Sequence, residues 1–240
     1  MDKFLKKIAF CNLIIFMLTT SIALAKDDNK IIEMDLKVFQ VNQPQIYKSL
    51  NNGQIVLTAV LDVQNNIYKN FKLKIGNTVK SFDWQSIGKK GLEPTIRLIN
   101  IGDEKEAGVV VFTTKAAGVG VFINDVKVFR IDNFSPVQVE NPVDIIKKHL
   151  KAVTEKDKII ITIDGTSTVL DKEYLSSIGV LNLTNRFYFD NHIGYELRNN
   201  NLIAEVGVSN ENLIYMGKVI VEYKFSDGSL KPSRIYFEKF

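Results

Sequence analysis

The feature that most constrains this fold is an alternation of apolar and polar residues in short runs. In the clearest run Phe71, Leu73 and Ile75 are apolar, whereas the residues between them, Lys72 and Lys74, are charged. Successive side chains of a strand point to opposite faces, so this period predicts strands with one buried side. Other strand-like runs span 33–41, 54–63, 79–84, 109–113, 118–121, 123–129, 159–163, 166–170, 186–189, 194–197, 202–208, 217–225 and 234–240. We therefore expect a mainly β (α+β) protein with antiparallel sheets.

Turn signals predict how several of these runs are paired. Gly76-Asn77 separates two runs, Asp164-Gly165 separates 159–163 from 166–170, and Asp227-Gly228 separates the last two. Such dipeptides favour tight connections between antiparallel strands. The runs 54–63, 71–75 and 79–84 therefore predict a meander. The continuous apolar run 109–113 predicts a strand that is buried on both faces.

One helix is predicted near 142–154. Asn141-Pro142 supplies a cap and a first-turn proline, and Val143, Ile146, Leu150 and Val153 recur at helical spacing. This helix ends an N-terminal β-rich half, 26–154, and a C-terminal antiparallel half follows at 155–240. The sequence leaves open whether the halves are two domains or one continuous domain.

The N-terminus predicts export. Residues 1–25 comprise a basic start, a short apolar run and the ending Ala23-Leu24-Ala25. This pattern is typical of a secretory signal peptide cleaved after Ala25. The apolar run is shorter than the ~20 residues that span a bilayer, although an uncleaved anchor is the alternative. We expect a secreted, extracellular or cell-envelope location, without stable membrane insertion after cleavage.

Composition excludes several classes of site from the exported chain. The only cysteine of the full sequence, Cys11, lies in the predicted signal segment. Disulfides and thiolate chemistry are therefore not expected in the exported chain. Removing three lysines and one aspartate of that segment from the 31 basic and 27 acidic residues leaves a net charge of +2. Such a balance predicts no broad nucleic-acid surface.

Catalytic motifs are not recognisable. The only histidines, His149 and His192, lie in different halves, and neither belongs to a hydrolase, zinc or phosphate-loop motif. We interpret both as structural and predict no catalytic residues.

The segment 100–108 is the candidate acidic site, because it carries Asp103, Glu104 and Glu106. Calcium loops place oxygen ligands at alternating positions around a glycine turn. Asn100, Glu104 and Glu106 fall on alternate positions, but Gly102 supplies no side-chain oxygen and Lys105 stands where a turn glycine would help. A solvated acidic turn is favoured over a calcium loop, so we expect no cofactor and no metal, with calcium as the alternative.

Trp84, the only tryptophan, is the other candidate binding residue. Single tryptophans can stack on sugars or anchor interfaces, and they can also close the edge of a core. The sequence favours the core interpretation and leaves binding open.

Several short stretches resemble secreted proteins of Gram-positive spore-forming bacteria that are described as similar to VCBS or FG-GAP repeats. In that group the segment 100–108 corresponds to a cation loop, D-x-N-x-D-G, which this chain replaces at nearly every key position. The resemblance implies no activity. The stretches that carry it are 68–75 with 82–84, 93–95, 113–114 with 118–121, 126–128 and 137–142.

Together these features predict an exported, non-catalytic binding or interaction protein whose partner is an envelope polymer or protein. The alternative is an envelope-polymer hydrolase that uses the carboxylates of segment 100–108. Glycoside hydrolysis requires two carboxyl groups across a cleft, which neighbours in one turn do not establish.

Overall fold

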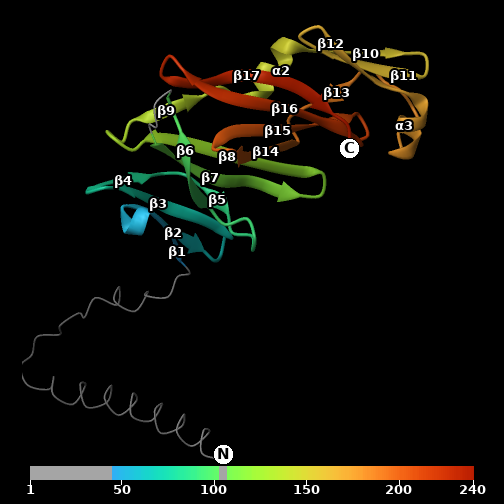
Figure 1. Ribbon diagram of the computed structural model, residues 1–240. Coiled ribbons are helices and arrows are strands. Elements are labelled where there is room, and N and C mark those ends of the chain that lie inside the picture. The colour runs from blue at the N-terminus through green and yellow to red at the C-terminus, as the bar shows by residue number, and fades with distance from the viewer. Residues whose placement is uncertain (1–44, 103–106) are drawn as a thin grey trace, which may run out of the picture. The chain divides into compact units, whose positions relative to one another are not determined.

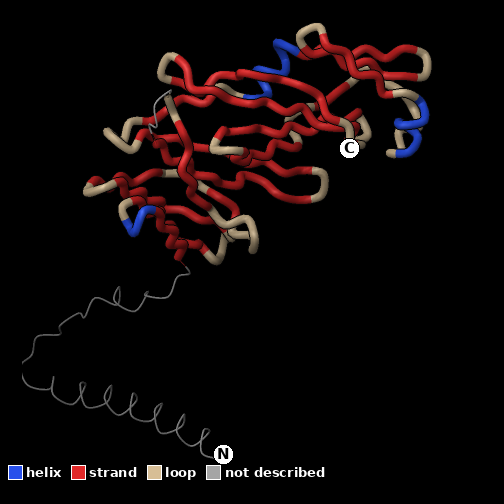
Figure 2. The backbone as a smooth tube through the Cα atoms, in the orientation of Figure 1, coloured by secondary structure: helices blue, strands red, loops and turns tan. Residues whose placement is uncertain are grey.

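Strands make up most of the described chain, which comprises residues 45–102 and 107–240 of the computed structural model (Figure 2). These residues belong to the unit Gln43–Phe240. The predicted mainly β fold with antiparallel sheets is confirmed. The predicted signal segment 1–25 and the predicted strand 33–41 lie outside the described residues.

The first sheet contains the predicted meander. Strand pairing follows the order β1–β2–β3–β4, all antiparallel, and β5 pairs with the start of β3. Phe71 and Leu73 are fully buried on one face, as the alternation predicts. A bulge interrupts β2–β3 pairing, and Asn70 there has φ of 56°. The elements of this region are β1 (Gln45–Leu50), η2 (Asn51–Gly53), β2 (Ile55–Asp62), β3 (Ile67–Ile75), β4 (Thr78–Phe82) and β5 (Ser86–Ile87).

The largest sheet has nine strands and closes on itself. Pairing runs β14–β15–β16–β17–β9–β8 and returns from β8 to β14, so six strands form a closed ring. Strands from both sides of residues 154 and 155 therefore share one sheet (Figure 1). Its members are β6 (Thr95–Asn100), β7 (Ala107–Gly118), β8 (Val121–Arg130), β9 (Pro136–Val139), β13 (Phe187–Tyr188), β14 (His192–Arg198), β15 (Asn201–Asn210), β16 (Tyr215–Ser226) and β17 (Ser229–Glu238).

The third sheet pairs β10 (Leu150–Glu155), β11 (Lys158–Ile163) and β12 (Thr166–Leu170). The predicted hairpin at Asp164-Gly165 is confirmed, because β11 and β12 pair antiparallel across it. Two helices flank this sheet, α2 (Pro142–His149) and α3 (Lys172–Ser177), and the sequence did not indicate α3. No helix in the described part of the chain is long and apolar enough to cross a membrane.

The helix predicted at 142–154 is too long. It begins as expected, with the Asn141 side chain accepting a hydrogen bond from the Val143 amide at 2.9 Å, but it ends at His149. Leu150 is extended, with ψ of 134°, and residues 150–155 alternate between half-buried and exposed. Residues 150–155 form a strand because pairing with β11 gives hydrogen-bond partners to backbone groups that would lack them at a helix end.

β7 separates two hydrophobic cores. Val109 and Val111 pack against the first sheet, and Val110 packs into the larger core beneath α2 and the third sheet. All three are fully buried, which confirms a strand covered on both faces. The strand predicted at 118–121 is wrong, because Val119 and Gly120 form the exposed turn between β7 and β8.

Candidate functional site

A cleft lies between the β4–β5 connection and the β7–β8 hairpin. Ser86 of β5 holds the two sides together, because its hydroxyl accepts a hydrogen bond from the Thr114 amide at 2.9 Å and donates to the Thr114 carbonyl at 3.3 Å. Ser86 is buried. This clamp fixes the connection that carries Trp84 against β7.

Trp84 stands at one wall of the cleft. Its indole stacks on Phe82, with ring centroids 4.0 Å apart and an angle of 14° between the planes. Phe71 and Phe129 complete the contact, at 5.8 Å and 5.9 Å between centroids. The side chain therefore closes the edge of the smaller core and also lines the cleft, with partial exposure.

An ion cluster forms another part of the wall. The Asp125 carboxylate contacts Lys115 at 2.9 Å and also Lys127, while its other oxygen accepts a hydrogen bond from the Val126 amide at 2.9 Å. Burial raises the pKa of Asp125, but hydrogen bonds from Lys127 and Lys115 outweigh burial and hold that pKa below its usual range. The carboxylate is therefore ionised and acts as a fixed hydrogen-bond acceptor at neutral pH.

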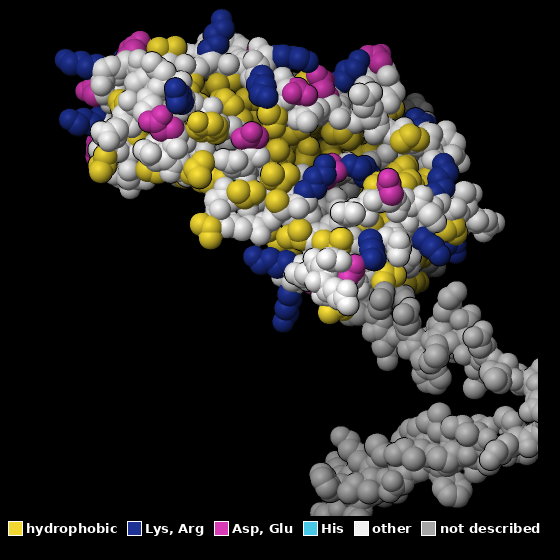
Figure 3. Space-filling model, turned by 180° about the vertical axis from the view of Figure 1, so that it is seen from behind, with side chains coloured by type: hydrophobic (Ala, Val, Ile, Leu, Met, Phe, Trp, Pro, Cys, Tyr) yellow, Lys and Arg dark blue, Asp and Glu magenta, His cyan; other side chains and the backbone are white. Residues whose placement is uncertain are grey.

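The cleft has a volume of about 420 Å³. The carboxylates of Asp83 and Asp125 balance the ammonium groups of Lys115 and Lys127 along its lining, beside hydroxyl and amide groups. The arrangement offers donors, acceptors and one aromatic ring without a strong net charge. The face drawn in Figure 3 is similarly mixed, with basic and acidic side chains interspersed around apolar ones.

A larger hollow of about 680 Å³ lies at the β3 bulge and shares Asp83 with this cleft. Its lining includes Thr58, Asn70 and Lys72, but neither Trp84 nor the Asp125 cluster. We therefore take the smaller cleft as the candidate site, because it alone combines the indole with fixed polar partners.

The acidic candidates from the sequence cannot be placed in either cavity. Asp103, Glu104 and Glu106 lie outside the described residues, and Asn100 ends β6 with an exposed side chain. Among the residues that the structure describes, no cluster of three or more metal-ligating side chains is present.

The two histidines lie apart from the cleft. The ring nitrogen Nδ1 of His149 is 2.8 Å from the Asp164 carboxylate, which joins α2 to the β11–β12 turn. His192 packs against Phe122 and Tyr215, and burial lowers its pKa.

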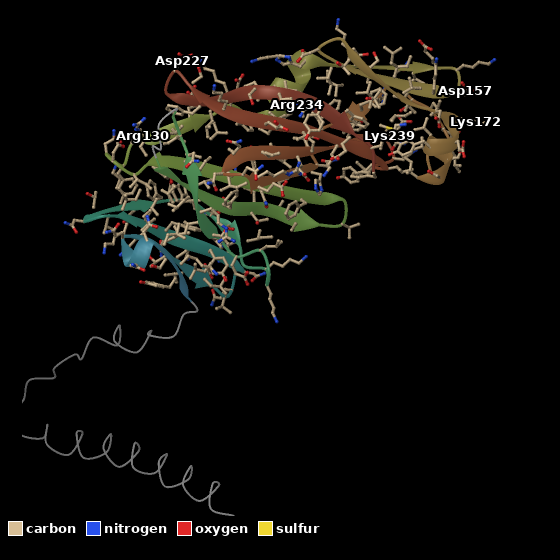
Figure 4. All side chains as sticks on the ribbon, in the orientation of Figure 1. Arg130, Asp157, Lys172, Asp227, Arg234 and Lys239 are labelled. Carbon is tan, nitrogen blue, oxygen red and sulfur yellow. The ribbon has the colours of Figure 1, made fainter. Side chains whose placement is uncertain are left out.

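Ion pairs elsewhere on the ring link neighbouring strands to each other. Glu205 of β15 contacts both Arg198 and Lys218, and Lys218 also lies 3.4 Å from Glu238. Arg234, labelled on β17 in Figure 4, lies 3.8 Å from Glu222. These charges satisfy one another across β14–β17, so they form a strand-linking network and not an open site.

Sequence reasoning named Trp84 but missed Ser86, Lys115, Asp125 and Lys127. One signal was available, because the charged residues Asp125 and Lys127 stand at alternate positions of one strand and must share a face. Lys115 and Ser86 reach them only through long-range pairing. Comparison with protein-family models, curated proteins and solved structures finds no match for this chain.

Proposed function

We propose that this chain is an exported, non-catalytic binding protein of the extracellular space or cell envelope, and that its cleft beside Trp84 binds a neutral saccharide. The observation that carries the proposal is the combination of an indole with a balanced set of fixed charges, hydroxyls and an amide in one concave site. Binding pockets typically join apolar walls to a few oriented polar groups.

The chemistry of the lining favours a neutral ligand. Sugar hydroxyls both donate and accept hydrogen bonds, so they match interleaved lysine, carboxylate and hydroxyl groups. A highly charged polymer would meet Asp83 and Asp125 as well as the lysines, and would gain little net attraction.

Catalysis is disfavoured by the state of Asp125. Glycoside cleavage by paired carboxylates requires one with a raised pKa that can donate a proton. The two lysines beside Asp125 lower its pKa instead. The group therefore suits ligand binding better than proton transfer.

The proposal is tested by titrating the full chain with maltotetraose and cellotetraose, which differ only in linkage. Trp84 is the only tryptophan, so its fluorescence reports this cleft directly. We expect saturable quenching or a spectral shift with at least one tetrasaccharide, and roughly tenfold weaker binding after Lys127→Met. Lys151→Met, on the exposed face of β10, is the matched control and should bind as the parent does.

Two results would contradict the proposal. One is the absence of any fluorescence response or heat of binding with either tetrasaccharide at millimolar concentration. The other is tighter, salt-sensitive binding of polygalacturonate, because it would identify a polyanion as the preferred ligand.

A further inference from the structure

The third sheet has two edges, and only one of them is covered. Along β10 the Thr154 amide donates a hydrogen bond to Asn185 Oδ1 at 3.1 Å, and the Thr154 hydroxyl donates to the Thr184 carbonyl at 2.6 Å. Along β12, within the described chain, no strand pairs with the outer edge. This edge therefore offers free backbone groups to a further strand.

The composition of β12 also permits pairing. Its five residues, Thr-Ser-Thr-Val-Leu, carry no charge. Proteins commonly place a charged residue on an exposed edge strand, because the charge opposes pairing with another chain. All other strands of at least five residues that end a sheet in the described chain follow this rule: Lys48 in β1, Lys80 in β4, Arg97 in β6 and Lys151 in β10.

The hairpin determines which residues of β12 present their backbone groups outward. Asp164 and Gly165 both have positive φ, and a two-residue turn of this kind closes on a hydrogen-bonded pair, here Ile163–Thr166. Hydrogen-bonded and non-hydrogen-bonded pairs then alternate along the hairpin. Ser167 and Val169 belong to non-hydrogen-bonded pairs, so their N–H and C=O groups point away from β11. Both residues are exposed.

These two residues lie symmetrically about Thr168. An antiparallel copy of β12 centred there places Ser167 of each copy opposite Val169 of the other and pairs all five residues of the strand. Moving the centre by one residue pairs the strand with the turn glycine Gly165 or with Asp171, which caps α3. The register centred on Thr168 is therefore the one that fits the strand.

The same register brings opposite charges together at both ends of the strand. Asp164 precedes Thr168 by four residues and Lys172 follows it by four, so each Asp164 lies opposite a Lys172 of the other copy. Among the described residues Lys172, labelled in Figure 4, has no ion-pair partner. The Asp164 side chain is 58% exposed beside His149. This self-complementary charge pattern favours a second copy of the chain over a foreign strand.

We propose that the protein forms a symmetric dimer in which β12 pairs antiparallel with β12 of a second copy, centred on Thr168. Two sheets of three strands then become one continuous sheet. The interface is isologous, because the same residues contribute from both copies. The Trp84 cleft contributes no residue to this contact, so the inference goes beyond saccharide binding and does not depend on it.

Disulfide trapping tests the register. Cys11 is the only cysteine, so the full chain with Cys11→Ser is a thiol-free background. In the dimer Thr168 faces itself in a non-hydrogen-bonded pair, with Cα atoms about 4.5 Å apart, which a disulfide can span. We expect Thr168→Cys to give a disulfide-linked dimer on mild oxidation. Thr166→Cys is the matched control and should stay unlinked, because its two copies are separated by four residues, roughly 13 Å along the strand.

Sedimentation of the full chain measures association without a cross-link. We expect a dimer that increases with concentration and is weakened at least tenfold by Ser167→Pro, because proline removes an outward N–H and no bond to β11. Val169→Lys should have a similar effect, because it adds a charge to the edge. Ser167→Ala, which keeps the N–H, and Val153→Lys are matched controls that should associate as the parent does. Val153 and Val169 both lie opposite Ile160 on one face, 53% and 43% exposed.

Several outcomes would overturn the inference. A parent chain that stays monomeric up to millimolar concentration refutes it, and so does linkage of Thr166→Cys as readily as of Thr168→Cys. Equal weakening by Val153→Lys and Val169→Lys would identify a face-to-face contact instead. If Ser167→Pro fails to fold, unchanged association of Val169→Lys alone refutes the proposal. A dimer that gives no response to either tetrasaccharide supports this inference and contradicts only the saccharide proposal.

Discussion

Replacing Asp125 with asparagine should destabilise the protein at neutral pH by about 1–3 kcal/mol. The substitution keeps the shape of the side chain and its acceptor for the Val126 amide, but it removes the charge that holds Lys115 and Lys127. The change therefore isolates the electrostatic role of the carboxylate.

The expected magnitude follows from the exposure of the three groups. The side chain of Asp125 is 21% exposed, whereas Lys115 and Lys127 are 59% and 36% exposed. Pairs that solvent reaches in this way contribute only about 0.2–1 kcal/mol each. A charged acceptor also strengthens the bond from the Val126 amide roughly twofold relative to a neutral one. Two screened pairs and one charge-assisted bond together give the stated range.

The difference between parent and variant should depend on pH with a defined sign. The folded pKa of Asp125 lies below its unfolded value, so its contribution is complete above the unfolded pKa, about 3.9. It is lost as pH falls through the folded pKa. Other carboxylates with lowered pKa, such as Asp62, titrate equally in both proteins, so they cancel in the difference.

Urea unfolding of both proteins, followed by Trp84 fluorescence at several pH values and two salt concentrations, measures this difference. The argument is refuted if Asp125→Asn is as stable as the parent at pH 7. It is also refuted if the difference grows as pH falls below 4, because that sign would require a raised pKa.

Further predictions test the core, the close packing of β16 against β17, and export. Phe71→Ala should destabilise the protein by about 3–5 kcal/mol, because the ring is fully buried, whereas the exposed Val79→Ala should change stability by less than about 0.5 kcal/mol in the same urea assay. Gly217→Ala should lower the melting temperature by many degrees, since a Cβ there would lie 2.5 Å from the Glu238 carbonyl; a melting temperature equal to the parent's would contradict this packing. N-terminal sequencing of the exported protein should begin directly after Ala25, and recovery of an intact N-terminus from a membrane fraction would count against cleavage.

The strands could be predicted because their signal is local. Alternation at Phe71–Ile75 and the continuous run at Val109–Val111 each match the observed burial. The turn at Asp164-Gly165 follows from backbone chemistry, since both residues have positive φ there. These features depend on neighbours in sequence and on which faces of a single strand are buried.

The end of α2 could not be predicted in the same way. Leu150 and Val153 continue the helical spacing, yet residues 150–155 also fit a period of two. The choice depends on β11, which pairs with all six residues of β10. Long-range pairing of this kind overrides local propensity.

The candidate site illustrates the same limit more strongly, since it depends on Asp125, which lies beside Asn124 in β8. Two polar neighbours in a strand must face opposite sides, so each requires its own partner if both sides are covered. The sequence indicates this requirement but not the partners. Pairing with β7 brings Lys115 to Asp125. Asp125 is thereby satisfied within the protein by a partner on a different strand, which the local sequence pattern of β8 does not identify.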